Sequence, residues 1–339
     1  MPNYFENIVG QDYACKLLSS QIEAGNTSHA YLFVGPAGCG KLNCAKALAK
    51  ALQGPGFVDQ IDNDSMVDVK IYEPEGVQTY LVGQITNIVK DSVLAPIQGQ
   101  YKIYILKEAD KLGTSAANAF LKTLEEPTQN VCFILLTNNA KNVLETINSR
   151  CQLVEFKQLP NDLAVETVMK ASGCDSNHSQ MAVELFGGNT TKAIEFCQDQ
   201  NMEDLYSEII STAESLDEDS DWDTIQRSND IINKIKEMVD VYKTELEEKT
   251  KDLSEVLEDS AISIIEDQNK RSANSKQKEL LHFFCAVLNK HYRDQLLESS
   301  NQESLISRLS CLSDFEQNLA YNISPQNFCD VVLLKLKRI

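Results

Sequence analysis

Apolar and polar positions follow two alternating patterns along the first 160 residues. Short apolar runs, typical of buried strands, are separated by stretches in which apolar residues recur at helical spacing. The predicted strands cover residues 30–34, 67–72, 103–106 and 131–136, and the predicted helices cover residues 41–52, 81–93 and 114–126. Thr114 is expected to cap the last helix and Pro127 to stop it. Strands that alternate with helices predict an α/β unit with a parallel sheet and helices on both faces.

From residue 161 onward the pattern predicts helices alone. Residues 161–200 are predicted to form a small helical unit with a turn at residues 187–189 (GGN). Apolar residues then follow the helical period at positions 231, 235, 238, 239, 242 and 246. Amphipathic helices are also predicted around residues 280–297, 305–319 and 326–337. The predicted fold class is therefore α/β followed by all-α.

Length and composition are those of an ordinary globular protein. The chain has 339 residues, 42% of them hydrophobic and 24% charged. Because a domain takes roughly 100–200 residues, two or three domains are expected. No apolar run approaches the ~20 residues of a membrane-spanning helix, and residues 1–11 lack the basic and apolar stretches of a secretory signal. We therefore expect a cytoplasmic protein without a membrane partner.

Negative charge is concentrated in one segment. The formal net charge is −19, and residues 201–270 alone hold 21 acidic and 7 basic side chains. This segment is expected to form a solvated helical arm. A free DNA-binding protein normally carries a broad basic face, which this sequence does not predict. Any contact with nucleic acid is therefore expected to be indirect or shared with partners.

Ten cysteines are scattered through the chain as single residues. The closest two, Cys39 and Cys44, are five positions apart, so the sequence has no Cys-x-x-Cys pair of the kind that zinc sites use. In a chain without a secretory signal, such cysteines are expected to be reduced, small and buried.

The sequence GPAGCGKL at residues 35–42 is the first candidate for chemistry. It follows a predicted strand and opens a predicted helix, as a phosphate-binding loop does. Gly35, Gly38 and Gly40 would let successive amides turn toward phosphates. Lys41 would reach the β- and γ-phosphates. The next position is normally Ser or Thr, whose hydroxyl binds Mg²⁺, but Leu42 offers no oxygen.

Lys107 and Glu108, at the end of the strand at 103–106, are the second candidate. In P-loop ATPases the first of these positions is an acidic residue that holds Mg²⁺, and a following glutamate can activate water. Lys107 places a cation where the metal should bind, while Glu108 is retained. Because both residues that normally bind Mg²⁺ are replaced, the sequence predicts that the chain hydrolyses no nucleotide. Binding of ATP or ADP without proper Mg²⁺ coordination is left open, as is the simpler interpretation of Lys41 as a surface lysine.

Arg150, within the sequence SRC at residues 149–151, is the third candidate. It is the only arginine before residue 227, whereas lysine occurs 14 times before that residue. Lysine is therefore accepted wherever plain positive charge suffices. A lone arginine indicates a need for the planar guanidinium that matches phosphate oxygens. The alternative is a structural salt bridge.

Several segments resemble the clamp-loader branch of the AAA+ proteins, and together they look like the delta-prime subunits of bacterial DNA polymerase III. They are HAYLFVGP at residues 29–36, AANAFLKTLEEP at 116–127 and SRCQ at 149–152. FENIVGQ at 5–11 resembles the opening of that family, and SPQ at 324–326 resembles the start of its closing collar helix. The resemblance is strong over residues 1–160, fair over 161–200 and weaker beyond.

The resemblance implies an organisation and a set of partners. An AAA+ P-loop core would occupy residues 1–160, a small helical lid 161–200, and a helical collar 201–339, with the acidic helical arm at about 201–270. Family members assemble as hetero-oligomers of five subunits that load a sliding clamp onto primed DNA. Delta-prime subunits act there as a stator that does not hydrolyse ATP, beside a delta subunit and motor subunits of the gamma/tau type.

The resemblance also implies roles for single residues. Arg150 would be an arginine finger that acts in trans on ATP bound in the neighbouring motor subunit. Asn138, or Thr137 beside it, falls at the first-sensor position. Lys192 falls at the second-sensor position. Gly35, Gly38, Gly40 and Lys41 would form a degenerate phosphate-binding loop.

Two features depart from the family, and two alternatives stay open. Many relatives carry a four-cysteine zinc module after the P-loop helix, but residues 51–72 contain no cysteine, so we expect no zinc and no required cofactor. The acidic arm is also larger than the corresponding segment of the simplest family members. An ATP-hydrolysing gamma/tau-type motor is one alternative, against which Leu42 and Lys107 argue. An adaptor-type AAA+ protein outside replication is the other, against which the SRC and LEEP sequences argue.

Overall fold

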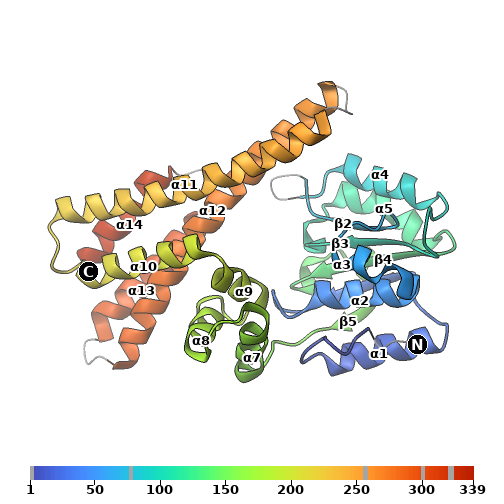
Figure 1. The fold of residues 1–339 in the computed structure, drawn as a ribbon, viewed down its shortest axis with the longest axis horizontal. Coiled ribbons are helices and arrows are strands. Elements are labelled where there is room, and N and C mark those ends of the chain that lie inside the picture. The colour runs from blue at the N-terminus through green and yellow to red at the C-terminus, as the bar shows by residue number, and fades with distance from the viewer. Residues whose placement is uncertain (1–3, 76–78, 255–258, 299–301, 320–323) are drawn as a thin grey trace. The chain divides into compact units, whose positions relative to one another are not determined.

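The computed structural model describes residues 4–75, 79–254, 259–298, 302–319 and 324–339. The chain divides into two compact units, the first made of residues 1–176 with 188–192 and the second of residues 177–187 with 193–339. The first unit contains the sheet and the second is helical (Figure 1). Among the described helices, none is both long enough and apolar enough to cross a membrane. The division into core, lid and collar stays a prediction.

The first unit is built on a five-stranded parallel sheet, which confirms the predicted α/β class. Its strands are β1 (Ala30–Val34), β2 (Val69–Tyr72), β3 (Lys102–Leu106), β4 (Val131–Thr137) and β5 (Gln152–Glu155), in the order β2-β3-β4-β1-β5. Tyr31 of β1 pairs with Ile134 on one side and Gln152 on the other. The segments that follow β1, β3 and β4 therefore meet at the carboxyl edge of the sheet.

Helices cover both faces of this sheet. The helices of this unit are α1 (Asp12–Glu23), α2 (Lys41–Gln53), α3 (Val58–Asp62), α4 (Val82–Ser92), α5 (Thr114–Glu125), α6 (Glu145–Asn148) and α7 (Asn161–Ser172). Figure 1 shows α4 and α5 on one side of the strands and α1 and α2 on the other. Leu32 and Phe133 pack with Phe120 of α5 in one buried cluster. Because side chains alternate along a strand, Tyr31 and Ile134 are buried on the opposite face.

Two local features of this unit differ from the predictions. Thr114 is the first residue of α5 rather than its cap, because Gly113 takes the extended conformation of the N-cap. β5 and α1 were not predicted. β5 is a short edge strand with an exposed Leu153, so it carries no continuous apolar run. The helix α5 does end before Pro127, as expected.

The second unit consists of helices, as predicted. The helices after residue 175 are α8 (Ser176–Leu185), α9 (Thr190–Gln198), α10 (Gln200–Ser215), α11 (Asp221–Ser254), α12 (Asp259–Glu298), α13 (Gln302–Asn318) and α14 (Pro325–Lys337). α11 packs against α12 and α14. Burial is described for its residues 221–248; the last buried one is Val239, and none of the side chains at 240–248 is buried. The acidic segment is thus helical and solvated there, while its residues 255–258 lie outside the described residues.

Candidate functional site

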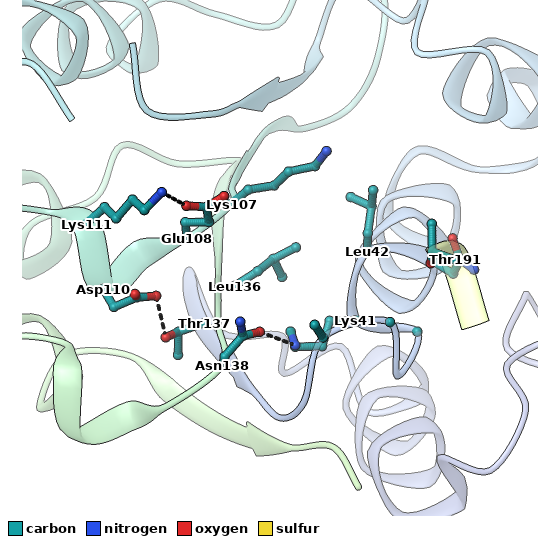
Figure 2. A pocket seen from close by; sticks show the side chains of 14 residues that line it. Lys41, Leu42, Lys107, Glu108, Asp110, Lys111, Leu136, Thr137, Asn138 and Thr191 are labelled. Atoms are coloured by element: carbon teal, nitrogen blue, oxygen red, sulfur yellow. Dashed lines mark hydrogen bonds and ion pairs between the residues drawn. The ribbon is translucent and has the colours of Figure 1, made fainter. Parts of the chain in front are cut away.

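The loop between β1 and α2 borders a cavity of about 530 Å³ at the carboxyl edge of the sheet (Figure 2). Gly38 and Gly40 have φ angles of +69° and +93°, a left-handed conformation that glycine adopts without strain. Gly35 donates its N–H to the carbonyl of Thr137 at 3.2 Å, which ties the loop to the end of β4. The loop is therefore anchored at both ends, with α2 starting directly after Gly40.

Lys41, the first residue of α2, is 9% exposed and directs its ammonium into the loop. Nζ donates to the carbonyls of Gly35 and Pro36, the latter at 2.6 Å, and to Oδ1 of Asn138 at 3.1 Å (Figure 2). Burial lowers the pKa of Lys41, and the nearby Cys39 and Asp110 partly offset this effect. The interpretation of Lys41 as a surface lysine is therefore wrong.

The two positions that would normally hold magnesium, Leu42 and Lys107, both line this cavity. In Figure 2 the side chain of Lys107 extends toward Leu42. Its Nζ forms an ion pair with Oε1 of Glu73 at 2.6 Å. Mg²⁺ requires oxygen ligands, whereas these two positions offer an apolar group and a second cation. These residues do not fit a magnesium ion held in the usual P-loop manner.

Two carboxylates line the cavity, and each already has a partner. Glu108 forms an ion pair with Lys111, and Oδ1 of Asp110 accepts a hydrogen bond from Thr137 Oγ1 at 2.8 Å. Glu108 also has a φ of +50°, which is sparsely populated for a residue with a side chain. Thr137 and Asn138 are both candidates for the first sensor. The hydroxyl of Thr137 donates a hydrogen bond to Asp110, whereas the side chain of Asn138 accepts one from Lys41.

Residues 188–192 lie against the glycine loop. Thr190 donates its hydroxyl to the carbonyl of Gly38 at 2.8 Å, and Thr191 lines the cavity. Lys192 and Arg150 are not among the described residues that line it. The structure thus brings Gly38, Gly40, Lys41 and Asn138 together in the lining of one cavity. Asp110, Thr190 and Thr191 were not predicted as site residues, although each lies within two positions of a predicted one, Glu108 or Lys192.

Arg150 lies just after α6, on the surface of the same unit. Its guanidinium pairs with the carboxylate of Glu125, with Nε 2.9 Å from Oε1. Nη1 donates to the carbonyl of Thr146 at 2.9 Å and to Ser149 Oγ at 3.3 Å. The side chains of Arg150 and Glu125 are 32% and 49% exposed. The salt bridge considered as an alternative therefore exists, but at an exposed site where such pairs contribute only about 0.2–1 kcal/mol.

Comparison with known proteins finds similarity between this unit and subunits of DNA polymerase III. Residues 10–160 match the family model described as DNA polymerase III, delta subunit. The tau subunit of DNA polymerase III from Bacillus subtilis is 37% identical over 180 residues, which are 50% of this chain and 32% of that protein. The delta' subunit from the same organism is 29% identical over 216 residues, covering 61% of this chain and 65% of that subunit. The chain thus spans about a third of the length of the tau subunit.

A solved structure extends the likeness beyond the first unit. A gamma subunit-related protein of DNA polymerase III from Thermotoga maritima has a TM-score of 0.53 and 16% sequence identity. The match covers 95% of this chain and 98% of that protein. At this identity the likeness concerns the fold alone.

Proposed function

We propose that this protein, whose residues 10–160 match the family model described as DNA polymerase III, delta subunit, is a member of the clamp-loader branch of the AAA+ proteins and a delta-prime-like subunit of a DNA polymerase III clamp loader. In this role it hydrolyses no ATP and acts as a stator beside gamma/tau-type motor subunits and a delta subunit. Arg150 acts in trans on ATP bound in the neighbouring motor. The sliding clamp and primed DNA are reached through the assembled complex, in which the helices of residues 201–339 serve as the collar.

The proposal rests on a contrast between the cavity, whose metal positions are altered, and Arg150. The cavity combines a glycine loop and a buried Lys41 with an apolar side chain and a cation at the two metal positions, Leu42 and Lys107. Without a bound divalent ion, the site lacks the group that neutralises most of the charge that develops as the γ-phosphoryl group leaves. Arg150, by contrast, lies at the surface with its side chain 32% exposed, so a second subunit could approach it. In this proposal Asn138 and Lys192 keep the family's sensor positions without a hydrolytic role.

The test is ATP hydrolysis by the purified chain, first alone and then mixed with its motor subunit, delta subunit, clamp and primed DNA. We expect no turnover alone and DNA-stimulated turnover in the mixture. Arg150→Ala should leave assembly intact and lower that turnover on the order of 10³-fold, the lower end for known arginine fingers. Lys41→Ala should leave turnover nearly unchanged. Unchanged turnover with Arg150→Ala would refute the finger assignment.

A gamma/tau-type motor is the second candidate, and specific observations favour it. The chain is 37% identical to a tau subunit over 180 residues, and it retains Lys41, Glu108 and Asn138. A motor would hydrolyse ATP alone in the presence of Mg²⁺, and Lys41→Ala would abolish that activity. Measuring the purified chain alone therefore separates the two candidates.

A further inference from the structure

Two segments that are far apart in the sequence meet at Arg150. Glu125 ends α5 within the LEEP sequence, and Arg150 follows α6 within the SRC sequence. Both Nε and Nη2 of Arg150 donate to the same carboxylate oxygen, Oε1 of Glu125. The carboxylate therefore holds one edge of the guanidinium, and the contacts with Thr146 and Ser149 hold Nη1.

These contacts fix the plane of the guanidinium and leave one donor available. Arginine has five N–H donors in a rigid fork. Within the described part of the chain, four of them have acceptors: one on Nε, two on Nη1 and one on Nη2. The remaining N–H is the second one on Nη2. An acceptor from outside the subunit would thus meet a guanidinium that is already oriented.

The backbone on both sides of this pair is firmly supported. Leu124, next to Glu125, and Ile147, in α6, are both buried in the same hydrophobic cluster of the core. Nε2 of His29 lies 2.9 Å from the carbonyl oxygen of Leu124, which links the end of α5 to the start of β1. The N–H of Arg150 donates to the carbonyl of Ile147 at 3.0 Å. Glu125 and Arg150 therefore project from two elements whose relative position is set by the core.

We infer that Glu125 is a positioning residue that holds the guanidinium of Arg150 ready for the phosphate groups bound in the neighbouring subunit. This inference rests on the proposed function. The pair is too exposed to contribute much to folding stability, since surface ion pairs are weak. A long arginine side chain at a surface otherwise samples many rotamers, and losing that freedom on binding lowers the rate that a finger can produce. Glu125 reduces this loss before the neighbour arrives.

The experiment compares Glu125→Ala and Glu125→Gln in the reconstituted loader, with Glu126→Ala as the matched control. Glu126 is the adjacent exposed glutamate, so it has the same charge and motif. Glu125→Ala should lower kcat about three- to tenfold with KM for ATP unchanged, because Arg150 must then be ordered each time it stabilises the transition state. Glu125→Gln keeps an acceptor oxygen and should recover most of the rate. Glu126→Ala should resemble the unmodified protein.

The outcomes separate this inference from the proposed function. If Arg150→Ala is inactive but Glu125→Ala turns over normally, the positioning role is wrong and the finger stands. If Arg150→Ala itself has no effect, the proposed function fails instead. An equal loss in Glu126→Ala, or a lower melting temperature in both Glu125 variants, would overturn the inference in favour of a general charge or folding effect. In the Arg150→Ala background, Glu125→Ala should cause no further loss.

Discussion

Replacing Gly38 with alanine should detach residues 188–192 from the glycine loop. An ideal Cβ at Gly38 would lie 2.0 Å from Oδ1, 2.5 Å from Cγ and 2.6 Å from Cα of Asn189. Gly40 is the matched control, because its φ is also positive but no described heavy atom lies within 4 Å of its ideal Cβ. The two substitutions share the backbone strain and differ in the collision with Asn189.

The expected magnitudes follow from these contacts. A residue with a side chain in the left-handed conformation costs roughly 1–2 kcal/mol, which is the full expected effect of Gly40→Ala. Gly38→Ala adds roughly 1–3 kcal/mol of steric misfit and about 1 kcal/mol for the hydrogen bond from Thr190 to the carbonyl of Gly38. Local stability should therefore fall by about 2–4 kcal/mol more in Gly38→Ala than in Gly40→Ala.

Hydrogen exchange measured by mass spectrometry is the suitable assay, because it resolves individual peptides. Peptides that cover residues 35–44 and 188–192 should lose more protection in Gly38→Ala than in Gly40→Ala. Fluorescence of Trp222, the only tryptophan, should not change, because it lies in α11 of the second unit. Adding Asn189→Ala to Gly38→Ala should restore part of the protection, since it removes Oδ1 and Cγ but not Cα. Equal loss in the two glycine variants would refute the steric argument.

Three further outcomes are expected. Burial alone would raise the pKa of Asp91, but hydrogen bonds from two lysines and a tyrosine lower it to about 2. The stability that this depressed pKa provides is present above pH about 4 and lost as pH falls toward 2. The advantage of the unmodified protein over Asp91→Asn in acid unfolding should shrink by about 1–2 kcal/mol across that range, allowing for solvent screening, and a constant difference would contradict this. In the second unit, Asp217→Ala should cost about 2–4 kcal/mol in urea unfolding followed by tryptophan fluorescence, because it leaves Arg308, 7% exposed, without its carboxylate. Arg308→Met should cost less, since Asp217 is exposed; the reverse order would be inconsistent with this explanation. The double substitution Leu42→Thr with Lys107→Asp should create nucleotide binding that requires Mg²⁺, measured by titration calorimetry with Mg²⁺ and with EDTA; identical titrations would argue against the metal assignment.

Local patterns in the sequence were sufficient for most elements of the first unit. The strands at the centre of the sheet, such as β4, are buried on both faces and therefore carry continuous apolar runs. The edge strand β5 was missed because its strand conformation depends on pairing with β1 rather than on its own residues. The helix α1 was missed for a similar reason, since only Ala14 and Leu18 of its residues are buried.

From the sequence alone, the chemistry of the candidate site could be inferred only from the types of residue at its positions. Leu42 and Lys107 stand at the two metal positions whatever the tertiary structure is, so the sequence by itself predicted a defective magnesium site. Only the folded chain decided that Lys41 bonds to the carbonyls of its own loop. Only the fold brings Glu125 to Arg150, because both project from elements that pack into one core. A motif predicts the local conformation of its own segment. Contacts between distant segments depend instead on how the apolar faces of the whole unit are buried together.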